Sequence, residues 1–173
     1  MSLRECLLKS GNRFECIVGS TIHSIFLGEL YLNVKFYSPN INRGTECDIF
    51  FLSNHAIYCI ECKNYKRFIS GSYLDLKWSF SSDGKIFKDT INGFIENDKH
   101  VRILNGLLRK EGIKNVPIFN YICVPNTCNI QSDCSNIKSL SDLIIEIRYL
   151  EEINKNIDFE KIKIKIENIM EVS

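Results

Sequence analysis

The sequence lacks several features that would each point to a particular class of protein. No apolar run approaches the roughly 20 residues that span a bilayer, and the first five residues, MSLRE, do not form the apolar core of a signal peptide. The formal net charge is only +1, which argues against a protein that holds nucleic acid non-specifically through many phosphate contacts. These absences predict a cytoplasmic protein without a membrane partner.

Motifs for several kinds of chemistry are missing as well. No G-x-x-x-x-G-K-[ST] loop suggests nucleotide hydrolysis, and no Ser–His–Asp or Cys–His arrangement stands out. The chain does contain an ordinary balance of 45% hydrophobic and 25% charged residues over 173 positions. This balance suits one globular domain with a sizeable core.

Hydrophobic periodicity predicts an α/β fold with a mixed central β-sheet flanked by helices. Strands are expected at 30–37, 47–52, 56–62, 68–70, 78–80 and 116–125, and helices at 14–26, 90–110, 140–150 and 159–170. Residues 1–173 then form a single domain, with a core at about 14–125 and C-terminal helices at about 138–171.

The segment YCIECKNYK, residues 58–66, carries two competing signals. Cys59 and Cys62 form a C-x-x-C, but side chains three apart on a strand diverge, whereas a zinc site needs both sulfurs on one metal. We therefore expect most of the eight cysteines to be buried small side chains. The alternative is a structural zinc held by Cys123, Cys128, Cys134 and another ligand, although their spacing gives no second C-x-x-C.

The charged residues of the same segment suggest a different site. Glu61 and Lys63 share one face of the strand, and a three-residue connection would bring Asp48, on the preceding strand, beside Glu61. Two carboxylates brought together are costly unless a cation lies between them, and oxygen ligands suit Mg²⁺ or Mn²⁺. From spacing alone, this metal site and a solvated strand end with an ordinary Glu–Lys pair both stay open.

The stretch GTECDIFFLSNHAIYCIECKNYKRFISG resembles the core of the nuclease-related domain (NERD), a family of the PD-(D/E)xK nuclease superfamily. The family pattern is an E-x-D strand, an apolar strand that ends in E-x-K-N, and an I-x-G segment. These motifs occur here as Glu46-Cys47-Asp48, Glu61-Cys62-Lys63-Asn64 and Ile69-Ser70-Gly71, followed by Trp78.

The resemblance implies a restriction-endonuclease-like fold with a four-stranded mixed sheet and Mg²⁺-dependent (or Mn²⁺-dependent) cleavage of DNA. It implies that Asp48 and Glu61 bind the metal together with the carbonyl oxygen of Cys62. Lys63 would position the attacking water or stabilise the phosphate under attack. The alternative is an inactive nuclease fold that binds DNA or a protein partner.

Residues on two helices extend the similarity. Glu15 matches the family's glutamate on its first helix, and it is either a further catalytic residue near the metal or a solvated helix position. The family's N-P-x-x-Q pattern corresponds to Asn92, Gly93 and Glu96, so that Glu96 is either another catalytic carboxylate or a helix-surface residue. His100 follows one turn later, where we expect it to be exposed to solvent.

The loop after the motif offers contacts for DNA. Lys66 and Arg67 are expected to meet phosphates, and Tyr65 is available for stacking on a base. A nuclease fold that cuts both strands often pairs, so a homodimer is an expected assembly.

Overall fold

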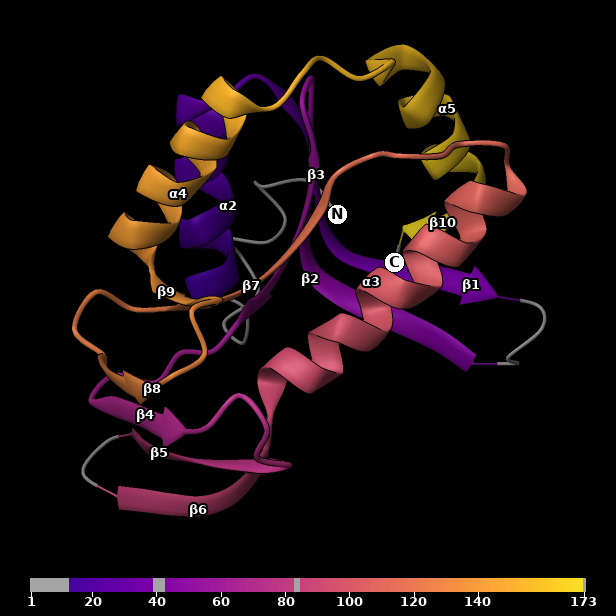
Figure 1. The fold of residues 1–173 in the computed structure, drawn as a ribbon. Helices are drawn as coiled ribbons and strands as arrows, with labels where there is room; N and C mark the ends of the chain where they lie inside the picture. The colour runs from indigo at the N-terminus through magenta and orange to yellow at the C-terminus, as the bar shows by residue number, and fades with distance from the viewer. Residues whose placement is uncertain (1–12, 39–42, 83–84, 173) are drawn as a thin grey trace.

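The computed structural model describes residues 13–38, 43–82 and 85–172, which form two sheets and four helices (Figure 1). The helices are α2 (Arg13–Ile25), α3 (Gly93–Lys110), α4 (Leu140–Ile153) and α5 (Phe159–Ile169). Within these ranges no helix is long and apolar enough to cross a membrane. All four helices were predicted from the sequence to within three residues at each end.

The larger sheet is mixed and runs in the order β10-β1-β2-β3-β7-β9. Its strands are β1 (Gly28–Ser38), β2 (Arg43–Ser53), β3 (Ile57–Cys62), β7 (Ile118–Val124), β9 (Ile137–Ser139) and β10 (Met170–Val172). The predicted hairpin is confirmed, with β2 antiparallel to β3, and β3 is parallel to β7. The expectation of four strands was wrong for this sheet, because β9 and β10 add three residues each, too few for a hydrophobic pattern to reveal.

Two helices cover each face of this sheet (Figure 1). Helices α2 and α4 pack on one face around Ile22, Tyr58 and Ile147. Helices α3 and α5 pack on the other face around Leu104 and Ile166. The strands are therefore apolar on both sides, as expected for the interior of an α/β domain.

A second, smaller sheet lies beyond the C-terminal end of β3 and runs in the order β6-β5-β4-β8. Its strands are β4 (Phe68–Gly71), β5 (Lys77–Ser82), β6 (Lys85–Ile91) and β8 (Asn129–Ser132). The prediction missed β6 and placed the start of the long helix at residue 90. Helix α3 begins at Gly93 because the side chain of Asn92 caps it, accepting hydrogen bonds from the N–H groups of Phe94 and Ile95.

Candidate active site

A local change in backbone direction sets the geometry of the hairpin that carries the candidate residues. Asn33, in the middle of β1, has a left-handed φ of 52°. Leu32 pairs with Ile49 and both face α2 and α4, whereas Val34 pairs with Cys47 and both face α3 and α5. Residues two apart in a regular strand share a face, so the β1–β2 ribbon turns over at this point.

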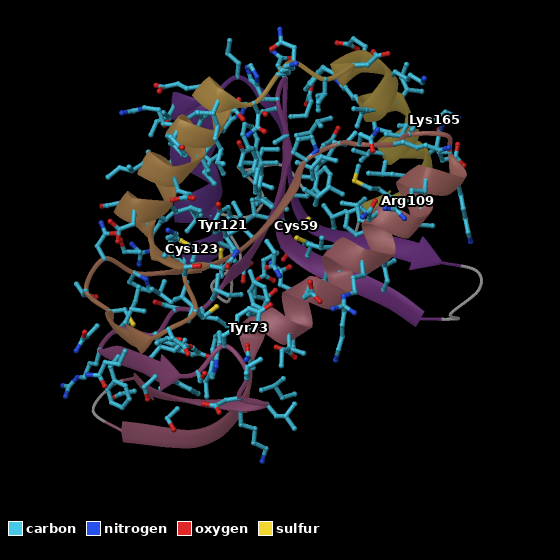
Figure 2. The ribbon with its side chains drawn as sticks, in the orientation of Figure 1. Cys59, Tyr73, Arg109, Tyr121, Cys123 and Lys165 are labelled. Atoms are coloured by element: carbon cyan, nitrogen blue, oxygen red, sulfur yellow. The ribbon has the colours of Figure 1, made fainter. Side chains whose placement is uncertain are left out.

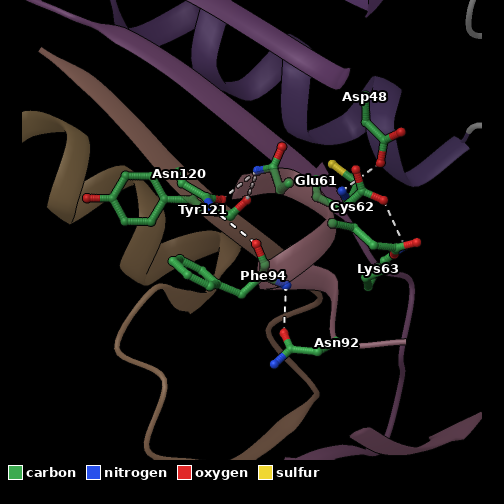
Figure 3. Close-up of polar contacts among 10 residues, drawn as sticks. Asp48, Glu61, Cys62, Lys63, Asn92, Phe94, Asn120 and Tyr121 are labelled. Atoms are coloured by element: carbon green, nitrogen blue, oxygen red, sulfur yellow. Dashed lines mark hydrogen bonds and ion pairs between the residues drawn. The ribbon is translucent and has the colours of Figure 1, made fainter. Parts of the chain in front are cut away.

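Asp48 lies where the β1–β2 ribbon reverses its two faces, at the point where β3 stops pairing with β2. The last regular pair on β2 is at Ile49, and Asp48 Oδ2 instead accepts a hydrogen bond of 2.8 Å from the N–H of Cys62 (Figure 3). Burial and the nearby carboxylates of Glu61 and Glu15 raise the pKa of Asp48 to about 7, although the Cys62 hydrogen bond opposes them. Asp48 therefore occupies the middle of its strand and not, as predicted, its start.

Glu61 and Lys63 lie at the end of β3, on the side where α3 begins. The ammonium of Lys63 is 2.7 Å from Glu61 Oε1, and both side chains are largely shielded from water. The backbone N–H of Lys63 donates to the Cys123 carbonyl of β7, which holds the residue in register after β3 has ended. Burial alone would lower the pKa of Lys63, but the bond to Glu61 and the charge of Glu96 leave that pKa raised.

Glu15 approaches the same place from the first turn of α2. Burial, together with the charges of Glu61 and Glu46, raises the pKa of Glu15. Its Oε2 atom is buried and has no hydrogen-bond partner among the described residues. The solvated alternative for Glu15 was therefore wrong. Glu46 is exposed, 4.0 Å from the ammonium of Lys35, and influences the site only through its charge.

Glu96 also faces Lys63, from the first turn of α3. Its Oε2 is 3.9 Å from Lys63 Nζ, and a Cβ at Gly93 would lie 3.4 Å from Cε of the same lysine. The side chain of Glu96 is still 35% exposed, so its place on the helix surface holds and its catalytic role stays a prediction. His100, which was expected to be exposed to solvent, is half-buried. Burial lowers its pKa, although the neighbouring carboxylates of Glu61 and Glu96 act to raise it.

Two buried asparagines hold α3 against the sheet, and the prediction missed both. The amide of Asn97 donates to the carbonyls of Cys59 and Tyr121 and to Asn120 Oδ1, at distances of 2.7–3.1 Å. Asn120 in turn donates to the Phe94 carbonyl (Figure 3). The available signal was position, because Asn97 falls four residues after Gly93 and seven before Leu104, on the stripe of α3 that is buried.

The loop expected to meet DNA divides into a buried and an exposed part. The ring of Tyr65 stacks on Phe80, with centroids 4.0 Å apart and planes inclined by 16°. That face of the ring is therefore not free for a base, contrary to expectation. Lys66 and Arg67 are exposed, which suits both a contact with phosphates and an ordinary solvated charged loop, so their role stays a prediction.

The residues present fit a hard divalent cation better than any softer metal. Charge repulsion from Glu61 raises the pKa of both Asp48 and Glu15, and one oxygen of Glu15 is buried without a hydrogen-bond partner among the described residues. A cation bound here would offset this repulsion and so stabilise the folded chain. The described residues nevertheless contain no group of three or more His, Cys, Asp or Glu side chains already arranged around one point. Backbone oxygen, water or substrate would have to complete the coordination, as is usual for Mg²⁺.

The cysteines give no support to the zinc alternative. The thiols at 47, 59, 62, 123, 128 and 134 are free. Figure 2 shows Cys59 and Cys123 on different strands, and Cys128 and Cys134 pack in a separate apolar cluster with Ile69 and Trp78. Cys16 is disulfide-bonded. Burial raises the pKa of Cys123 to about 12, as expected of a packed thiol.

Comparison with known proteins identifies the family. No curated protein and no solved structure matches the chain significantly. Residues 10–125, more than half of the chain, match the profile described as nuclease-related domain. The matched range contains the E-x-D and E-x-K-N motifs as well as Glu15 and Glu96. The chain therefore belongs to the nuclease-related domain (NERD) family, within the PD-(D/E)xK-like nuclease superfamily.

Proposed function

We propose that this chain is a metal-dependent nuclease that hydrolyses DNA phosphodiester bonds with Mg²⁺ or Mn²⁺. The observation that carries the proposal is that two motif carboxylates meet the end of β3: Asp48 Oδ2 accepts the N–H of Cys62, and Glu61 Oε1 lies 2.7 Å from the ammonium of Lys63. Carboxylates that repel one another beside the Lys63 ammonium destabilise the folded chain unless a ligand binds there, and such perturbed groups are typical of functional sites. Membership of a nuclease-related family points in the same direction.

Each residue has a role that follows from its position. Asp48 and Glu61 bind the metal, with the Cys62 carbonyl as a further oxygen, and the N–H of Cys62 fixes the direction of the Asp48 carboxylate. The bound metal supplies a Lewis acid and an activated water. Lys63 keeps its proton because its pKa is raised. It therefore acts as a cation and hydrogen-bond donor to the phosphate, stabilising the charge that develops there.

The test is cleavage of linear duplex, circular duplex and single-stranded DNA in Mg²⁺, in Mn²⁺ and in chelator. We expect metal-dependent cutting by the native chain and its loss in Lys63→Ala and Asp48→Asn. Lys155→Ala, which removes an exposed cation in the α4–α5 connection, is the matched control and should cut normally. Cutting that survives both site substitutions would refute the assignment.

An inactive nuclease fold remains the second candidate, favoured by one observation. Lys63 is already paired with Glu61 and lies near Glu96, so two carboxylates compete with a phosphate for its ammonium. Salt-dependent DNA binding without cleavage under every metal condition would establish this candidate. Sedimentation of the native chain with and without duplex DNA would show whether two copies assemble on it.

A further inference from the structure

The connection between β4 and β5, residues 72–76, exposes large apolar side chains; we call it the apolar loop. Leu74 is 81% exposed and Leu76 is 77% exposed, and Tyr73 is 45% exposed. Ile91, at the end of β6, is a fourth exposed apolar side chain. It lies near the loop because the N–H of the next residue, Asn92, donates a hydrogen bond to the Leu76 carbonyl. Burying a leucine side chain is worth about 1.5–3 kcal/mol, so the fold forgoes a substantial gain at this place.

The backbone of the apolar loop is held in place at several points. The amide of Asn92 donates to the carbonyls of Tyr73 and Asp75, and the indole N–H of Trp78 donates to the carbonyl of Ser72. Asp133 accepts a 2.6 Å hydrogen bond from the N–H of Tyr73. The two leucines are thus presented by a fixed backbone, which suits a surface that a partner meets with little ordering cost.

The apolar loop lies next to the candidate active site. Asn92, which holds the loop, also caps α3, and the following residue, Gly93, contacts the stem of Lys63. The ring of Tyr73 lies 4.9 Å from that of Phe94, in the same first turn of the helix, and Figure 2 shows Tyr73 beside the start of α3. The start of α3 is therefore in contact with the apolar loop on one side and close to Lys63 on the other.

The charges around the loop decide which part of a nucleic acid it would meet. Asp75 and Asp133 both hold backbone N–H groups of the loop, and their negative charge opposes contact with phosphates. Exposed cations stand at both ends of this region, with Lys77 directly after Leu76 and with Lys66 and Arg67 just before β4. A DNA strand whose phosphates contact these cations and Lys63 would turn its bases, and not its sugar-phosphate backbone, toward Leu74.

We propose that the apolar loop acts as a wedge against the bases of the nucleic acid substrate, next to the phosphate at Lys63. This inference rests on the proposed function. Apolar side chains inserted at a base step unstack it and kink the duplex at a cost of a few kcal/mol, which is lowest where the bases are mismatched or already unpaired. The chain then prefers DNA with a mismatch or a junction to a single strand over fully paired duplex.

The test uses a duplex carrying 2-aminopurine, whose fluorescence rises when it unstacks, with and without an adjacent mismatch. The variants are Leu74→Ser/Leu76→Ser and Leu74→Ser alone, and the matched control is Leu27→Ser, which changes an 84% exposed leucine at the opposite end of α2 from Glu15. We expect the native chain and the control to raise the fluorescence. The double variant should lose that rise and bind the mismatched duplex at least tenfold more weakly, so that its preference for mismatched over paired duplex disappears.

Each outcome of this test has a distinct meaning. If the native chain cuts DNA but leaves the fluorescence unchanged, or if the double variant behaves like the native chain, the wedge is refuted while the nuclease assignment stands. If the native chain neither binds nor cuts DNA, the proposed function fails and the wedge fails with it. If the double variant instead converts a dimer to a monomer with unchanged DNA binding, the loop is a self-association surface and the proposal is wrong.

Discussion

The ionised state of Asp48 should destabilise the metal-free protein at neutral and alkaline pH. Its pKa in the folded chain is about 7, against an ordinary value of 3.8 for the unfolded chain, because burial and the neighbouring carboxylates disfavour its charge. A carboxyl group whose pKa is raised on folding binds a proton more tightly in the folded state, so stability falls as the pH rises from about 4 to about 7. Asp48→Asn removes the charge while keeping an oxygen that can accept the N–H of Cys62.

The size of the effect follows from the gap between the two pKa values. Each pH unit in that interval is worth about 1.4 kcal/mol, so the ionised carboxylate costs the fold about 4 kcal/mol above pH 7. For a chain of this length about 1 kcal/mol corresponds to 2–4 °C in the unfolding temperature. Asp48→Asn should therefore melt about 10 °C higher than the native chain at pH 8 and at nearly the same temperature as the native chain at pH 4.

The assay is thermal unfolding followed by circular dichroism from pH 4 to pH 8, in the presence of chelator. Glu152→Gln, which changes an exposed carboxylate on α4, is the control and should follow the native curve. Addition of Mg²⁺ at pH 8 should raise the melting temperature of the native chain, because a ligand that binds only the folded state stabilises it, and should raise that of Asp48→Asn much less. Parallel pH curves for the native chain and Asp48→Asn would refute the reasoning.

Three further substitutions test the surroundings of the site. Gly71→Ala should cost more than about 2 kcal/mol, because its φ is 148° and a Cβ would overlap the indole of Trp78; urea unfolding followed through this single tryptophan measures the loss. Asn97→Ala should cost about 3 kcal/mol in the same assay, because it leaves buried carbonyls of two strands unsatisfied; a loss below 1 kcal/mol would contradict this role. Glu96→Gln should raise kcat/KM for DNA several-fold by removing a negative charge near Lys63; a fall would mean that the carboxylate itself is required.

The part of the fold with strong local patterns was predictable from the sequence. The β2–β3 hairpin follows from two apolar runs and a three-residue connection, and the pairing of Asp48 with the end of β3 follows from that hairpin. The strands that were missed, β6, β8, β9 and β10, are short or polar and depend on partners distant in the chain. Hydrophobic periodicity carries no information about such partners.

Only those contacts of the candidate site that join residues close together in the sequence could be predicted. Spacing brings Glu61 beside Lys63, but nothing local shows that Glu96 reaches the same lysine. That approach depends on α3 being anchored by Asn97, whose hydrogen bonds reach strands distant in the chain. The left-handed turn at Asn33 was equally hidden, because asparagine adopts a positive φ more often than most residues but in only a minority of its positions.

The parallel pairing of β3 with β7 has a consequence for how the protein folds. The hairpin that carries Asp48, Glu61 and Lys63 is local and can form early, whereas β7 must close a long intervening loop to join β3. Lys63 is held in register by a β7 carbonyl, and Glu96 is placed by a helix anchored on β7. The charged site is thus complete only in the finished fold, and a chain released before β7 would carry the motif without the site.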